Sequence, residues 1–179
     1  MNKGKPKERI YVLLTDYPNQ LSRLIKGIGF WKYSHVSIST SRYFPTFYSF
    51  TGKKGFVTED YRLHPTYKGK EVPCALFALP VTVIEKKKIE EKIEQRKSRP
   101  DLFKYSVGGL ILLYLHTIPR QYKKDTCVGF VARTISECTS LVSNYKKELY
   151  NPNKFQSRFQ DHLVFEGFLS RISKKSFAL

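Results

Sequence analysis

The chain has 179 residues, of which 41% are hydrophobic, and its 32 Lys and Arg against 15 Asp and Glu give a formal net charge of +17 at pH 7. This length fits one domain with a sizeable core, and the apolar and aromatic content excludes a disordered or fibrous protein. Three irregularly spaced cysteines exclude a disulfide framework and a paired-cysteine zinc site, so reduced thiols are expected.

The predicted organisation is a single domain over residues 1–179 that begins with a basic leader over residues 1–8. The longest apolar run, residues 107–115, is shorter than the roughly 20 residues that cross a bilayer. The first residues lack the hydrophobic core of a secretion signal. We therefore expect a cytoplasmic protein.

The basic residues are spread along the chain rather than gathered in one motif. A field of this sign attracts polyanions, including an anionic membrane surface. No signature of a nucleic-acid-binding module accompanies the charge, so nucleic acid is not an expected partner.

In the first half of the chain, residues 9–15 are β-branched and aromatic, which predicts a buried strand. Residues 16–28 have the capping residues and apolar spacing of a helix. Residues 35–39 and 46–50 follow as two antiparallel strands. We expect a long irregular loop over residues 51–73, because this stretch holds several Gly and Pro residues.

Residues 74–81 form a nearly continuous apolar run, which predicts another strand. Thr82 and Glu85 have the spacing of a capping box for a helix over residues 83–97. An apolar helix is expected over residues 102–116.

Cys127 opens the next expected helix, with Asp125 or Thr126 as its cap. A further helix begins at residues 151–152, and residues 164–169 read as a last edge strand. These elements predict an α+β fold in which an antiparallel sheet packs against helices.

Cys127 lies in the first turn of its predicted helix, where the helix dipole and free backbone N–H groups stabilise a thiolate and a developing oxyanion. His35, Ser37 and Ser39 alternate onto one face of their strand, and such a polar face must be hydrogen-bonded or line a cleft. His35 could therefore serve Cys127 as its base. Asp125 would disfavour the thiolate if its carboxylate pointed at the sulfur rather than at backbone N–H groups.

Other interpretations of these residues stay open at this point. A lone cysteine is commonly a packing residue, and a lone histidine on a strand is commonly a structural group. His64, in the expected loop, is a rival base. His116 and His162 fall on predicted helices and are weaker candidates.

Four segments, taken in chain order, resemble the circularly permuted branch of the NlpC-type papain-like hydrolases, the YiiX-like group of cysteine peptidases or amidases. They are residues 34–39, 48–50, 55–60 and 126–132. In that branch the histidine strand precedes the cysteine helix, which reverses the papain order, as in this chain. The resemblance covers roughly residues 10–169 and extends distantly to lecithin:retinol acyltransferase-like enzymes.

The resemblance implies a permuted papain-like fold in which Cys127 is the nucleophile and His35 the base. Ser49 falls at the third catalytic position, where relatives carry Glu, His or another polar residue. A peptidase or amidase of this kind forms an acyl-enzyme with a peptide, amide or acyl substrate and needs no cofactor and no metal.

Two alternatives remain open. One is a lipid or protein acyltransferase that uses the same dyad and is recruited to an anionic membrane. The other is a catalytically silent basic protein that binds a polyanion.

Overall fold

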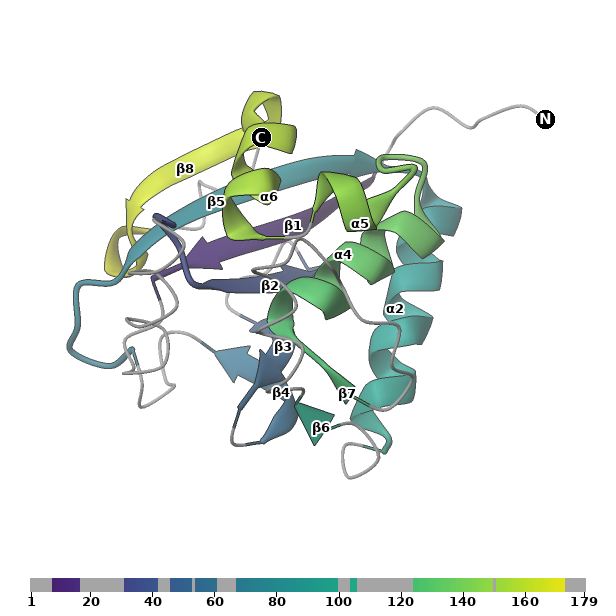
Figure 1. The fold of residues 1–179 in the computed structure, drawn as a ribbon, viewed down its shortest axis with the longest axis horizontal. Coiled ribbons are helices and arrows are strands. Elements are labelled where there is room, and N and C mark those ends of the chain that lie inside the picture. The colour runs from purple at the N-terminus through teal and green to yellow at the C-terminus, as the bar shows by residue number, and fades with distance from the viewer. Residues whose placement is uncertain are drawn as a thin grey trace.

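The chain folds into a mixed α+β structure, seen in a computed structural model (Figure 1). The structure describes residues 8–16, 31–41, 46–52, 54–60, 67–99, 104–105, 124–149 and 151–172. Within them, six strands form one antiparallel sheet in the order β4-β3-β2-β1-β5-β8. These strands are β1 (Glu8–Thr15), β2 (His35–Ser39), β3 (Thr46–Thr51), β4 (Gly55–Asp60), β5 (Pro73–Val81) and β8 (Leu163–Phe168).

Two of the described helices are longer than the others, and the strands outside the main sheet are short. The two longer helices are α2 (Val83–Lys97) and α4 (Cys127–Cys138). The others are α5 (Tyr145–Glu148), α6 (Pro152–Arg158) and the 3₁₀ turns η2 (Gln160–His162) and η3 (Leu169–Arg171), and a small parallel pair joins β6 (Lys104–Tyr105) to β7 (Lys124–Asp125).

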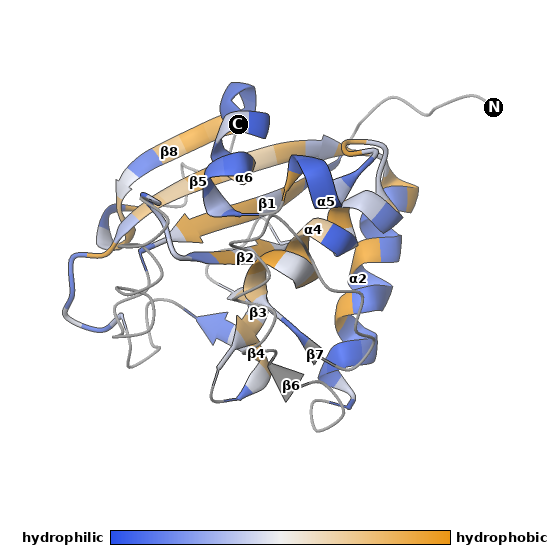
Figure 2. Cartoon of the chain, viewed as in Figure 1, coloured by the Kyte–Doolittle hydropathy of each residue, from blue (hydrophilic) through white to orange (hydrophobic). Residues whose placement is uncertain are grey.

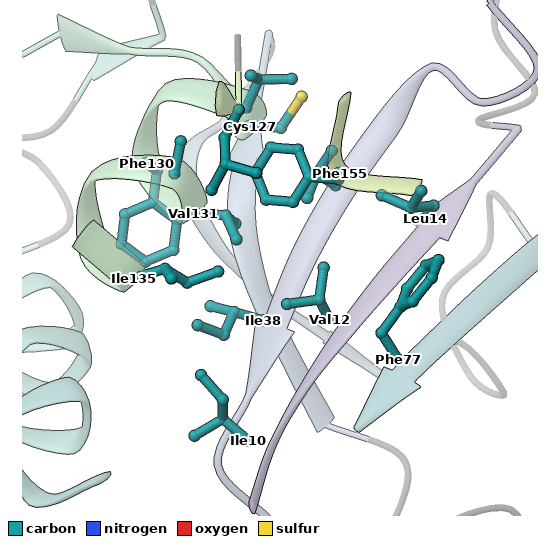
Figure 3. Packing of buried hydrophobic residues seen from close by; sticks show 14 of the residues in the cluster. Ile10, Val12, Leu14, Ile38, Phe77, Cys127, Phe130, Val131, Ile135 and Phe155 are labelled. Carbon is teal, nitrogen blue, oxygen red and sulfur yellow. The ribbon is translucent and has the colours of Figure 1, made fainter. Parts of the chain in front are cut away.

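The larger hydrophobic core lies between the sheet and helices α2 and α4. Helix α4 packs against β2 and β3, and α2 packs against α4. Figure 3 shows Val131 and Ile135 of α4 directed toward Ile38 and Val12 of the sheet. Strands β1 and β5 are largely apolar along their length (Figure 2). A second buried cluster, which includes Tyr11, Leu13, Cys74 and Leu76, is made by residues that alternate with the first set along β1 and β5.

Helix α2 begins at the predicted capping box. The Glu85 N–H donates to Thr82 Oγ1, and the Thr82 N–H donates to Glu85 Oε2. Ile89 and Ile93 are buried, as their spacing predicts. The second oxygen of Glu85 accepts the Ser140 N–H at 2.8 Å, so one carboxylate joins the start of α2 to the segment that follows α4.

The predicted loop over residues 51–73 is wrong for Gly55–Asp60, which form β4 and pair along their whole length with β3. The glycines suggested an irregular segment, whereas Gly55 has φ 70° and ends the tight turn into the strand. The predicted helix over residues 102–116 is wrong at Lys104–Tyr105, which form β6, and its other residues lie outside the described part.

The remaining predictions have mixed outcomes. The helix expected over residues 16–28 lies outside the described residues from position 17 onward. Glu8, placed in the leader, is the first residue of β1. The last edge strand is confirmed as β8, and the helices that begin at Cys127 and Pro152 are confirmed as α4 and α6.

Candidate catalytic site

Cys127 is the first residue of α4, and Thr126 is its cap. Thr126 Oγ1 accepts the Gly129 N–H at 2.9 Å, and the Thr126 carbonyl accepts the Phe130 N–H. The Cys127 side chain lies at the start of the helix, near Phe155 of α6 (Figure 3). Only 5% of Cys127 is exposed. The cap therefore gives α4 a well-formed first turn, and Cys127 is in that turn.

His35 is the first residue of β2 and lies opposite Thr15 of β1. Its Nε2 is 3.0 Å from Glu59 Oε2, and both side chains are buried. The imidazole also hydrogen-bonds the Cys127 side chain. One histidine therefore contacts both the thiol and a carboxylate, and this chain of three groups is the arrangement that thiol nucleophiles use.

Burial lowers the pKa of His35, but this effect is outweighed by the charge of Glu59 and by hydrogen bonds with Cys127 and Glu59, so the pKa rises from 6.5 to about 10. The imidazole is therefore charged at neutral pH. A buried imidazolium needs a partner of opposite charge, and the Glu59 carboxylate is that partner.

Ser49, predicted at the third catalytic position, does not contact His35. Its hydroxyl donates to the Val36 carbonyl at 2.6 Å and links β3 to β2. The residue that contacts the imidazole is Glu59, on β4, directly opposite Phe47. Because the sequence predicts a loop over residues 51–73, it does not identify Glu59 as a site residue. Phe56 is buried, Thr58 is exposed and Glu59 is buried, so residues 55–60 lack the regular alternation by which a half-buried strand is recognised in a sequence.

The Asp125 carboxylate binds a backbone N–H group, which is the arrangement that does not disfavour a Cys127 thiolate. Its Oδ1 accepts the Thr126 N–H at 3.0 Å, and its Oδ2 lies 3.1 Å from Arg133 Nη1. Burial raises the pKa of Asp125 to about 6, an effect that Arg133 opposes. The two carboxylate oxygens of Asp125 therefore link the segment before Cys127 to Arg133 in the second turn of α4.

Of the other candidate residues, only some fall within the part of the chain that the structure describes. His64 and His116 lie outside the described residues, and His162 is in η2. Cys74 is fully buried in β5, where burial raises its pKa to about 12, and Cys138 is at the far end of α4, where burial also raises its pKa. Within the part of the chain that the structure describes, neither thiol has a histidine hydrogen-bonded to it in the way that Cys127 has His35.

No group of His, Cys, Asp and Glu among the described residues could hold a metal ion. In the same part of the chain, no helix is long and apolar enough to cross a membrane. Comparison with family models, with curated proteins and with solved structures finds no match.

Proposed function

We propose that this chain is a cysteine hydrolase, a peptidase or amidase with a permuted papain-like arrangement, in which Cys127, His35 and Glu59 form the catalytic triad. The observation that carries the proposal is that His35 contacts both the Cys127 thiol and the Glu59 carboxylate. Glutamate is one of the residue types, Glu, His or another polar residue, that relatives carry at the third position, and unlike Ser49 it brings a negative charge.

In the proposed reaction, the Cys127 thiolate attacks the carbonyl carbon of an amide or ester, and a C–S bond forms as the carbonyl becomes an oxyanion. The backbone N–H of Cys127 and a neighbouring N–H at the start of α4 stabilise this oxyanion. His35 then donates its proton to the leaving amine or alcohol, and the acyl-enzyme remains. Water, deprotonated by His35, releases the acid and regenerates the thiol.

The role of Glu59 follows from which ring nitrogen it binds. Because Nε2 faces the Glu59 carboxylate, Nδ1 is the nitrogen left for the thiol. The carboxylate fixes the ring orientation and stabilises the imidazolium that pairs with the thiolate. Glu59 acts through His35 and is not itself a nucleophile or an acid.

Alkylation of the native protein with iodoacetamide across pH, followed by mass mapping, tests the proposal. Cys127 should react first, and the buried Cys74 and Cys138 serve as internal controls in the same sample. His35→Ala should slow the reaction of Cys127 without exposing the other two thiols. If Cys127 is as inert as Cys74 in the folded protein, the hydrolase proposal is wrong.

A further inference from the structure

The first turn of α2 exposes two large hydrophobic side chains. In the described part of the chain, the large hydrophobic residues that are exposed are Val83, at 59%, and Ile84, at 69%. They are consecutive, so they form one apolar patch rather than two scattered residues. Figure 2 shows this hydrophobic turn at the right-hand edge of the molecule, beside the end of β5. Ile89 and Ile93 are the residues that α2 buries, so its packing on the core does not use Val83 or Ile84.

Two lysines lie next to the apolar patch on the helix surface. Lys87 is four residues after Val83, and Lys88 is four residues after Ile84, which is the spacing that brings side chains together on one face of a helix. Both lysines are exposed. Among the residues that the structure describes, neither lysine forms an ion pair. The patch is therefore bordered by two ammonium groups that are available to an anion.

The acidic residues of α2 are placed away from this patch or are already engaged. Glu85, in the first turn, accepts the Thr82 N–H with Oε2 and the Ser140 N–H with Oε1. Glu90 and Glu91 come about one turn after the two lysines begin. The basic part of the helix is therefore the part that carries the apolar patch.

The basic leader joins the fold at the same place. Glu8 begins β1 opposite Val81 of β5, and Glu8 Oε2 lies 2.8 Å from Lys86 Nζ in the first turn of α2. Residues 1–7, which precede Glu8, include three lysines and no acidic residue. Their covalent attachment at Glu8 therefore adds positive charge beside the apolar patch.

We infer that the start of α2, with Val83, Ile84, Lys87 and Lys88, is a docking surface for an anionic phospholipid bilayer. Val83 and Ile84 enter the boundary between headgroups and acyl chains, while the two lysines and the leader bind the anionic headgroups. An apolar contact and a basic patch are each weak alone, and together they hold a protein reversibly at a membrane. A polyanion in water would pair with the lysines but leave the apolar patch in water. The inference does not depend on the proposed function, because none of these residues belongs to the proposed triad.

Flotation of the full chain with phospholipid vesicles at physiological ionic strength tests the inference. Binding should require phosphatidylserine in the vesicles and should be weak on phosphatidylcholine alone. Val83→Thr with Ile84→Thr keeps the branched side chains but removes the apolar contact, and should weaken binding about tenfold or more. Lys87→Gln with Lys88→Gln should weaken binding about 30-fold, since each lysine near an anionic surface contributes about fivefold. Urea unfolding of both variants should match the wild type, because all four side chains are exposed.

The net charge of +17 attracts every anionic surface, so the test needs a matched control. Lys68→Gln with Lys70→Gln removes the same charge from two exposed residues that precede the start of β5. Helix α2 follows the end of this strand, about 27 Å away. Since salt screens charges over about 8 Å, the control should weaken binding no more than about twofold. Equal losses in the two lysine variants would mean that attraction is diffuse, and would overturn the inference.

A fluorescent side chain reports whether this surface enters the bilayer. Ile84→Trp should emit at shorter wavelength when vesicles that contain phosphatidylserine are added. Ser170→Trp, at an exposed residue of η3, is the control and should not shift. The native Trp31 is buried and gives the same background in both variants. No shift at position 84, or equal shifts at both positions, contradicts the inference.

A second copy of this chain is the other occupant that the test separates. Sedimentation velocity without vesicles measures the oligomeric state of the wild type and of the variant Val83→Thr, Ile84→Thr. Both should sediment alike. If the variant dissociates a dimer and binds vesicles as tightly as the wild type, the apolar patch is a contact between copies, and the membrane inference is wrong.

Discussion

His35 Nε2 lies 3.0 Å from Glu59 Oε2, although β3 separates their strands in the sheet. The contact crosses 24 residues of sequence and is buried at both ends. A charged pair in this position costs solvation free energy, which its mutual attraction and the Cys127 hydrogen bond offset. Buried, strongly perturbed ionisable pairs of this kind are common at functional sites, which is consistent with the proposed role of His35 and Glu59.

Glu59→Gln should slow alkylation of Cys127 by about 100-fold or more, because the amide keeps the shape of the carboxylate but cannot stabilise the imidazolium. The rate is measured with iodoacetamide at pH 7. Ser49→Ala is the matched control, because it removes a buried polar group from the neighbouring strand. We expect it to cost about 1 kcal/mol of stability and to leave the rate within a few-fold of wild type. If Ser49→Ala slows alkylation more than Glu59→Gln does, Ser49 rather than Glu59 is the third residue of the site.

Stability should depend on pH through His35. Its pKa is about 10 in the folded state against 6.5 unfolded, so its contribution is fully present below pH 6.5 and is lost as pH rises through about 10. The free energy of unfolding is measured by urea denaturation at pH 6, 8 and 10 for wild type and for the double variant His35→Gln, Glu59→Gln. The advantage of the wild type should shrink as pH rises. An advantage that grows with pH would show that His35 is neutral in the folded protein.

Replacing one partner of the Asp125–Arg133 ion pair should strongly lower the free energy of unfolding. Asp125→Asn removes the negative charge that faces the Arg133 guanidinium and should cost about 3–5 kcal/mol. The double variant Asp125→Asn, Arg133→Met should cost clearly less than the sum of the single changes. Glu94→Gln, in the exposed pair with Lys97, is the control and should cost at most about 0.5 kcal/mol. Additive losses at Asp125 and Arg133 would mean that the two side chains are not coupled.

Thr126→Ala should cost about 1 kcal/mol, because the Gly129 N–H loses its acceptor, and Thr126→Ser should restore most of the loss. The alanine variant should also slow the alkylation of Cys127, since the first turn that contains this residue is less well held. Thr82→Ala at the start of α2 is a cap of the same kind away from the thiol. It should lower stability by a similar amount and leave the alkylation rate unchanged.

Local signals in the sequence predict the starts of α2, α4 and α6. The capping box at Thr82 and Glu85, the cap at Thr126 and the Asn151–Pro152 start each depend on residues within one turn, so spacing alone is enough to locate them. The same is true of Cys127 as the first residue of its helix. The antiparallel pairing of residues 35–39 with residues 46–50 was also predictable, because the two runs are close in sequence.

Non-local pairing accounts for what the sequence did not predict. Strand β4 is short and begins at a glycine, and its hydrogen-bonding partner in the sheet is β3. The sequence of residues 55–60 by itself therefore predicts part of a loop. The position of Glu59 beside His35 depends on a contact across β3, which local sequence spacing does not reveal. A serine hydroxyl can donate its hydrogen bond to a nearby backbone carbonyl, and Ser49 donates to the Val36 carbonyl. Its residue type alone does not distinguish this role from a hydrogen bond to His35.

The order of the proposed triad along the chain has a consequence for biosynthesis. His35 and Glu59 belong to the first four strands, and β5 completes five strands of the sheet by residue 81. Cys127 follows only after α2 has been made. A ribosome therefore synthesises His35 and Glu59 before Cys127, and under the proposed function the nascent chain has no thiol paired with His35 until most of the sheet has been translated.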